Sequence, residues 1–229
     1  MTALVLSAGG MFGAWQVGVW KALSGRFQPD LVVGASAGAL NGWAIAGGAS
    51  AEDLKESWLD PATSKILLLR RPEALFQVAR SLYNRFRPHL PIGVPLVEFP
   101  RLRARLARNE EIRWEHLAAS CSIPLWFPPV RIGDKRYVDG GLRAALPLWA
   151  AEEMGATRAI AVSAFELPMA ALLRFVVVPP TTSDRLSVIR IKPSEPLGPL
   201  HHAMLWSPTR LRRWMDLGEY DGNMAVSRL

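Results

Sequence analysis

A serine between two glycines is the first place where this sequence could do chemistry. Residues 34 to 38 read Gly-Ala-Ser-Ala-Gly, after the β-branched run Leu31 to Val33 and before small and apolar residues that suit a helix. A strand, a sharp turn and a helix would present Ser36 on the turn, with helix N–H groups near its oxygen. Glycine at 34 and 38 would remove Cβ atoms that collide in so tight a reversal. We therefore predict a nucleophile elbow at Ser36.

The same region admits another interpretation. Between Asp30 and Glu52 there are 21 residues without a charge, which is long enough for a membrane span. Five glycines, two serines and Asn41 lie within it, and these favour a strand, a turn and a buried helix instead.

A glycine-rich stretch near the N-terminus could bind an anion. The run Thr2 to Ser7 suits a strand, residues 14 to 23 suit a helix, and Gly9, Gly10 and Gly13 lie between them. The spacing is not that of a dinucleotide-binding loop, so we expect no nucleotide. Backbone N–H groups of such a loop can instead hold the oxyanion of a serine hydrolase.

Asp139 is followed by Gly140 and Gly141 at the end of a predicted hairpin, whose strands are residues 130–132 and 137–138. A carboxylate at a strand end can project towards a neighbouring site. An Asp-Gly pair also forms ordinary turns, so both explanations stay open here.

The remaining pattern predicts an α/β fold. Ser50 and Asp53 suit the start of a helix through Trp58. We expect helices at 102–106, 110–120, 147–155 and from Ser207, and strands at 159–163 and 186–191. The prolines between 72 and 100 favour short helices and loops over sheet, and we make no prediction for 164–183. Alternating strands and helices indicate a mostly parallel sheet covered on both faces.

Composition narrows the class of protein. The chain has 229 residues, half of them hydrophobic, and we expect one domain over 1–229. The single cysteine, Cys121, excludes an internal disulfide and a zinc site of its own, and favours a reducing compartment. With no signal-like N-terminus, we expect a cytoplasmic protein with a peripheral position at the inner membrane surface.

The formal charge of +7 comes from the middle of the chain. Residues 65–108 hold ten basic residues and two acidic ones, and apolar residues recur among them at helical spacing. This is typical of a basic amphipathic surface helix, which suits an anionic membrane. No nucleic-acid-binding motif accompanies it, so we expect a lipid or acyl-ester partner and no nucleic acid. We make no prediction of the oligomeric state.

Three stretches in this order resemble the patatin-like phospholipase family: residues 6–19 its glycine-rich oxyanion loop, residues 34–38 its nucleophile elbow, and residues 139–141 its aspartate motif. The approach to the last motif, from Ala119 onward, is also similar, so the resemblance covers about residues 2–47 and 98–163. Two positions depart from the pattern: Ala8 stands where the family has glycine, and Phe12 where it has a basic residue. Residues 60–97 match no motif that we can name and are expected to form a variable, basic, cap-like region.

The resemblance implies a three-layer α/β sandwich and a serine acyl hydrolase that needs no cofactor or metal. It implies that Ser36 is the nucleophile and Asp139 its base, and that the N–H groups of Gly9, Gly10 and Met11 hold the oxyanion. The motif glycines are Gly13, Gly34, Gly38, Gly140 and Gly141. Because a carboxylate base needs a raised pKa, we expect Asp139 to be buried.

Two alternatives remain at this stage. One is an α/β-hydrolase that pairs Ser36 with His201 or His202. The other is a catalytically silent lipid-binding protein on the same fold. The residues do not specify the natural substrate or its acyl-chain length.

Overall fold

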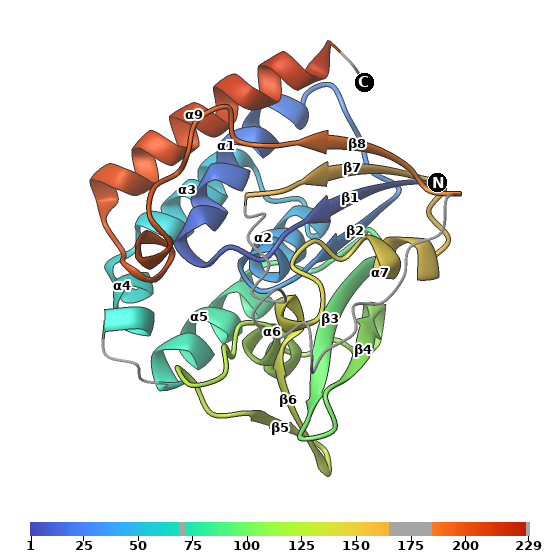
Figure 1. Ribbon diagram of the computed structural model, residues 1–229, viewed down its shortest axis with the longest axis vertical. Helices are drawn as coiled ribbons and strands as arrows, with labels where there is room; N and C mark the ends of the chain where they lie inside the picture. The colour runs from blue at the N-terminus through green and yellow to red at the C-terminus, as the bar shows by residue number, and fades with distance from the viewer. Residues whose placement is uncertain (69–71, 165–184, 228–229) are drawn as a thin grey trace.

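The computed structural model describes residues 1–68, 72–164 and 185–227 (Figure 1). Its eight-stranded sheet has the order β5-β6-β3-β2-β1-β7-β8, and β4 also pairs with β3. The strands are β1 (Thr2–Leu6), β2 (Leu31–Gly34), β3 (Ile92–Phe99), β4 (Arg103–Arg108), β5 (Val130–Ile132), β6 (Lys135–Asp139), β7 (Arg158–Val162) and β8 (Ser187–Ile191). The α-helices are α1 (Gly13–Leu23), α2 (Ala37–Ala46), α3 (Ala51–Leu59), α4 (Pro61–Leu68), α5 (Pro72–Arg85), α6 (Trp114–Ser120), α7 (Leu148–Glu153) and α9 (Pro208–Val226). Short 3₁₀ helices are η1 (Gly10–Phe12), η2 (Asn109–Glu111), η3 (Gly140–Leu142) and η4 (Leu200–Met204).

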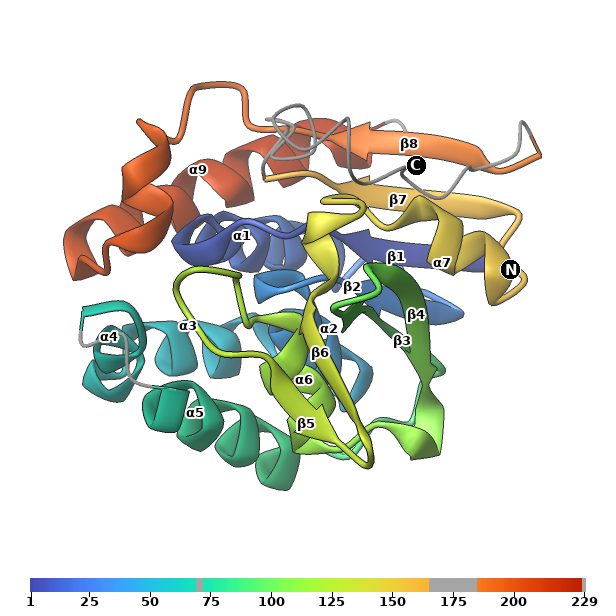
Figure 2. The same ribbon diagram turned by 60° about the horizontal axis from the view of Figure 1, so that its bottom comes forward.

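The sheet lies between two helical layers, as Figures 1 and 2 show. Side chains alternate along β1, so Leu4 and Leu6 join the core formed with α1, α2, α3 and α9. Ala3 and Val5 point to the other face and join the core formed with α7. This is the predicted three-layer α/β sandwich.

The centre of the sheet is parallel and one end is antiparallel. β3, β2, β1, β7 and β8 run parallel to one another, whereas β4, β5 and β6 join by antiparallel pairs. The prediction of a mostly parallel sheet is therefore confirmed for its central strands.

β2 and β6 both pair with the same edge of β3, and this brings distant parts of the chain together. β4 pairs with β3 from Gly93 to Glu98. On the opposite edge, β2 pairs only with the start of β3, where Val33 lies beside Gly93. β6 pairs with the second half, where Asp139 lies beside Leu96. The carboxyl ends of β2 and β6 therefore face each other across a short gap.

The prolines between 72 and 100 misled the sequence prediction, because β3 and β4 lie where loops and a helix at 102–106 were expected. Proline has no N–H to donate, so it normally weakens a strand. Pro95 lies within the gap between β2 and β6, where that edge of β3 has no strand partner, and its carbonyl accepts a hydrogen bond from the Ser120 hydroxyl (3.1 Å). A proline is tolerated at this position for that reason.

Most other elements follow the predictions. Ser50 and Asp53 form a capping box at the start of α3, and the expected hairpin is β5 and β6. The helix expected at 110–120 is confined to α6, after η2. Residues 31–51 form β2, the turn at Ser36, α2 and the start of α3. Among the described residues no helix has the length and apolar character to cross a bilayer. Residues 165–183, for which no prediction was made, lie outside the described residues.

The amphipathic pattern of the basic region corresponds to α5, and its apolar side packs inward. Leu75, Ala79 and Leu82 are buried in the main core. Two arginines of α5 have partners within the protein: Arg80 lies over the Trp114 ring (4.0 Å), and Arg85 pairs with Asp53 (2.5 Å). The helix is thus a wall of the core with a solvated basic side.

Candidate active site

Ser36 occupies a strained turn between β2 and α2. Its φ of 54° and ψ of −125° lie outside the regions that non-glycine residues usually adopt, and such strain costs on the order of 1–3 kcal/mol. Ser36 is only 4% exposed. α2 begins directly after Ser36, so the positive end of its dipole lies close to the serine oxygen. This is the geometry of a nucleophile elbow.

Gly34 and Gly38 allow the turn to close. A Cβ atom on Gly34 would collide with the carbonyl oxygen of Gly38, and one on Gly38 would lie 2.5 Å from the Leu6 oxygen and 2.6 Å from the Ser7 oxygen. No side chain can be accommodated at such separations without moving backbone. These two glycines therefore let α2 approach the ends of β1 and β2.

Ser120 fixes the elbow from the other side, and sequence reasoning did not identify it. Its hydroxyl accepts the N–H of Ser36 (3.0 Å) and donates to Pro95 (3.1 Å). The side chain is fully buried. The only sequence signal was the run of small residues at 119–122, which spans the end of α6. This run does not indicate which group the Ser120 hydroxyl binds. Ser120 thus ties the backbone of Ser36 to β3.

Asp139 ends β6 and is only 6% exposed, as expected for a carboxylate base. Burial raises the pKa of its carboxyl from the ordinary 3.8 to about 7, against hydrogen bonds with the Ser36 side chain and the Gly141 N–H. The hydrogen bond from the Gly141 N–H to the Asp139 carboxyl is 2.7 Å long, and Gly140 and Gly141 begin η3. A carboxylate with this pKa in contact with a serine hydroxyl can accept its proton near neutral pH.

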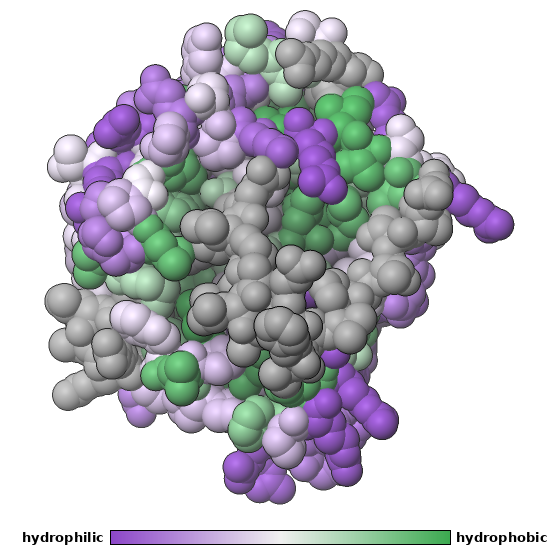
Figure 3. Space-filling model, in the orientation of Figure 1, coloured by the Kyte–Doolittle hydropathy of each residue, from purple (hydrophilic) through white to green (hydrophobic). Residues whose placement is uncertain are grey.

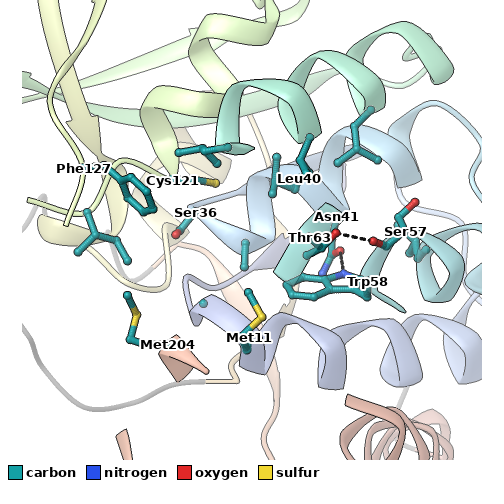
Figure 4. A pocket seen from close by; sticks show the side chains of 17 residues that line it. Met11, Ser36, Leu40, Asn41, Ser57, Trp58, Thr63, Cys121, Phe127 and Met204 are labelled. Atoms are coloured by element: carbon teal, nitrogen blue, oxygen red, sulfur yellow. Dashed lines mark hydrogen bonds between the residues drawn. The ribbon is translucent and has the colours of Figure 1, made fainter. Parts of the chain in front are cut away.

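Cys121 lies beside Ser36 in the same pocket (Figure 4). Burial raises the pKa of its thiol well above the ordinary value, with a further rise from the Asp139 charge and an opposing hydrogen bond with Ser36. The thiol is therefore neutral at physiological pH, and Cys121 behaves as a small buried side chain.

The predicted oxyanion loop meets Ser36 in this pocket. Gly10 and Met11 line it together with Ser36, while Gly9 precedes them in the chain and is not among the lining residues. Gly10 has a φ of +54°, and a Cβ atom there would collide with the carbonyl oxygen of Ala203 in η4. Glycine at position 10 is required by that close approach.

The two departures from the family pattern have structural explanations. Phe12 is buried and packs edge-to-face on Trp214 of α9, with ring centroids 5.0 Å apart. It therefore ties the loop to α9. Ala8 donates its N–H to the Ala145 oxygen (2.7 Å), and its Cβ lies 2.7 Å from where a Cβ of Gly141 would be. A glycine at 141 thus leaves room for Ala8.

A buried polar network, formed by Asn41, Gln16 and Trp58, joins the elbow helix to the glycine loop. The Asn41 amide donates to the Gly13 oxygen (3.0 Å) and to the Gln16 side chain (3.0 Å). Its oxygen accepts the Trp58 indole N–H (2.8 Å). Gln16 in turn donates to the Ser7 oxygen (2.7 Å). Because Asn41 lies on α2, five residues after Ser36, the network fixes the glycine loop relative to Ser36.

An apolar pocket extends away from Ser36, and Figure 4 shows its two ends. Ser36, Cys121, Phe127 and Met204 lie at one end, and Thr63 lies with Ser57, Asn41 and Trp58 at the other. Leu75, Val78 and Leu82 of α5 line it as well. The cavity measures about 70 Å³. Such a lining suits a hydrocarbon chain.

The histidines lie away from this arrangement. No histidine is among the described residues that line the pocket. His201 and His202 belong to η4 and stack edge-to-face on each other, 4.6 Å apart. The buried His116 accepts the Arg113 N–H (3.0 Å) at the start of α6. In the described parts of the chain no group of three His, Cys, Asp or Glu side chains could hold a metal ion.

Comparisons with known proteins found a family match and structures with a similar fold. The family model described as patatin-like phospholipase matches residues 4–152. The chain is similar to the crystal structure of VipD from Legionella pneumophila, at 14% identity and a TM-score of 0.55, over 99% of this chain and 67% of that one. It is also similar to the type III effector protein ExoU, at 15% identity and a TM-score of 0.48, over 99% of this chain and 52% of that one. The chain thus spans about two thirds of VipD and about half of ExoU. A comparison with curated proteins found no match.

Proposed function

This chain belongs to the patatin-like phospholipase family, and from that premise we propose that it is a serine acyl hydrolase that cleaves fatty-acyl esters of lipids. Ser36 is the nucleophile and Asp139 the general base. The observation that carries the proposal is the placement of a buried Asp139 beside Ser36, a serine on a strained elbow, with burial raising the pKa of the Asp139 carboxyl to about 7.

The reaction runs in two halves. The Ser36 oxygen attacks the ester carbonyl while its proton passes to Asp139, and the protonated Asp139 then gives that proton to the departing alcohol. The product is an acyl-Ser36 ester. A water molecule attacks this ester, Asp139 accepts the water's proton, and the fatty acid leaves as the serine regains its proton.

The oxyanion formed in each half is held by backbone donors of the glycine loop, Gly9, Gly10 and Met11. The contact of Gly10 with Ala203 and the network at Asn41 support this role, because they hold the loop in place before substrate arrives. Losing one such donor costs about 3 kcal/mol of transition-state stabilisation. A rigid loop provides this stabilisation without reorganisation.

The acyl chain occupies the apolar pocket beyond Ser36. Its far wall comes from α4 and α5, through Thr63, Leu75, Val78 and Leu82. The predicted cap-like region was residues 60–97, but residues 92–97 belong to β3 of the central sheet. We therefore take only its helical part, α4 and α5, as a cap-like part of a single hydrolase domain, which sets the space for the chain. A peripheral contact with an anionic membrane would bring the enzyme to its substrate.

The proposal is tested by hydrolysis of soluble acyl esters and of phospholipid vesicles by wild type, Ser36→Ala and Ser57→Ala. Ser57 also lines the pocket, and its hydroxyl donates to the Asp53 carbonyl (2.9 Å). We expect Ser36→Ala to lose activity on both substrates and Ser57→Ala to keep it. Equal activity in Ser36→Ala and wild type would refute the proposal.

A further inference from the structure

We propose that this protein docks on anionic lipid bilayers through one surface, made of the exposed apolar residues Leu125, Leu200 and Leu205 and the hairpin cations Arg131 and Arg136. We call it the docking surface. The inference rests on the proposed function, because it places the lipid at the entrance to the Ser36 pocket. It assigns membrane contact to loops rather than to the basic helix α5.

Leu125 is fully exposed and has an unfavourable backbone conformation, and neither feature stabilises the folded chain. Its side chain is 100% exposed, and its φ is 73°, in the left-handed region that leucine avoids. The turn is held by bonds from the N–H groups of Trp126 (3.1 Å) and Phe127 (2.9 Å) to the Ile123 oxygen. A fixed turn therefore holds a large apolar side chain in water, which suggests a contact outside the chain.

The turn that exposes Leu125 also builds the pocket. Ile123 and Phe127, two residues to either side, both line the Ser36 pocket. On the other side of Ser36, Met204 of η4 lines it, and the adjacent Leu205 is 45% exposed. In both segments, apolar residues exposed to solvent therefore lie next to residues that line the pocket.

Exposed apolar residues gather around this entrance. Among the described residues seven large apolar side chains are exposed, and Leu125, Leu200 and Leu205 belong to the two segments that line the Ser36 end of the pocket. In Figure 3, green side chains reach the surface over the segment between α6 and β5, beside the hydrophilic hairpin tip. Isolated exposed leucines are common, but a cluster at the entrance to an apolar pocket suits a lipid phase.

The β5–β6 hairpin supplies a second, independent observation. Arg131 and Arg136 are both exposed and lie directly opposite each other in the ladder, and like charges in that position destabilise a hairpin. No ion pair to either arginine is found among the described residues. Arg131 follows Leu125 by six residues, so at most about 22 Å of chain separates them. An apolar tip beside two cations fits an anionic bilayer surface.

The basic helix α5 is a weaker choice for the same role. Its apolar residues are buried in the core, and Arg80 and Arg85 are engaged by Trp114 and Asp53. Neither its apolar side nor these cations are free for lipid. A protein partner could cover leucines, but the pocket of a lipid hydrolase has to open towards lipid, and we therefore take the bilayer as the occupant.

The test is vesicle binding by the Ser36→Ala protein, which leaves the lipid intact, using phosphatidylcholine vesicles with and without phosphatidylglycerol. Leu125→Asn is the main variant, because asparagine tolerates the left-handed backbone, and Met224→Asn is its control on the exposed side of α9. We expect Leu125→Asn to bind both vesicles about tenfold more weakly, as the loss of one buried leucine predicts. Met224→Asn should bind normally.

The double variant Arg131→Gln/Arg136→Gln should lose affinity for the anionic vesicles only, with Arg212→Gln on α9 as the control. With Ser36 restored, Leu125→Asn should hydrolyse a soluble short-chain ester at the wild-type rate and keep at least the wild-type unfolding temperature. Unchanged vesicle binding in Leu125→Asn and in the double variant would overturn the proposal, as would a parent protein that binds neither vesicle. Vesicle binding needs no catalysis, whereas absence of ester hydrolysis would refute the proposed function instead.

Discussion

We predict that the ionised, buried Asp139 carboxyl destabilises the folded protein, and this effect can be measured separately from catalysis. Its pKa in the folded chain is about 7, against an ordinary value of 3.8, because it is buried. At 1.36 kcal/mol per pKa unit, this difference corresponds to about 4 kcal/mol. Asp139→Asn keeps the size of the side chain and an oxygen that can accept the Gly141 N–H, but it removes the charge. We expect the variant to be inactive and, at high pH, more stable than wild type.

The sign follows from the protons bound in each state. Below about pH 4 the carboxyl is protonated in both the folded and unfolded chain, so its charge has no effect on stability. Between about pH 4 and pH 7 the unfolded chain releases a proton that the folded chain keeps, so the free energy of unfolding falls as the pH rises. Above about pH 7 the loss is complete. Asp139→Asn should lack this fall and exceed wild type by up to about 4 kcal/mol at pH 8–9.

The assay is urea unfolding of both proteins from pH 4 to pH 9, followed by tryptophan fluorescence. Asp221→Asn is a matched control, since Asp221 is also buried and accepts the Trp15 indole N–H (2.8 Å). That carboxylate makes stabilising bonds, so its replacement should cost about 1–3 kcal/mol. An Asp139→Asn protein less stable than wild type at pH 8, with the same pH dependence, would refute the reasoning.

Three further predictions follow from the site. With Asp139 as base, kcat/KM of wild type should rise with pH to a plateau above about pH 7, in a pH–rate profile on a soluble ester; a flat profile from pH 5 to 8 would contradict this. Asn41→Leu should lower kcat far more than it changes KM. It should also lower the unfolding free energy by about 1–3 kcal/mol for each buried polar group that loses its hydrogen-bond partner. Thr63→Val, at the same end of the pocket, is the control and should leave kcat near the wild-type value. Leu82→Ala should shift preference in a series of acyl esters towards longer chains, and an unchanged optimum would show that α5 does not set chain length.

The main architecture could be predicted because local signals and tertiary structure agree. β1, β2 and the elbow combine strand residues, glycines and a following helix, so the position of Ser36 followed from spacing alone. The capping box at Ser50 and Asp53 fixed the start of α3 in the same way. Where propensity, turn chemistry and packing coincide, sequence reasoning is reliable.

The errors arose where a tertiary contact outweighs local preference. Pro95 argues against a strand, yet it lies at the gap in β3 where no N–H is needed. Ser120 looks like a small helix residue, but its hydroxyl holds the Ser36 N–H from 84 positions away. The amphipathic pattern of α5 gave a helix correctly, but periodicity cannot tell whether its apolar side faces a membrane or the core. These features depend on contacts that no window of sequence contains.

The most direct test of the central claim is reaction with a fluorophosphonate probe, with the modified residue identified by peptide mass spectrometry. We predict one adduct on Ser36 in wild type, none in Ser36→Ala, and a loss of labelling in Asp139→Ala. A His201→Ala/His202→Ala protein should label like wild type. A folded wild type that carries no adduct at Ser36, or one whose labelling depends on the histidines instead of Asp139, would contradict the Ser36–Asp139 mechanism.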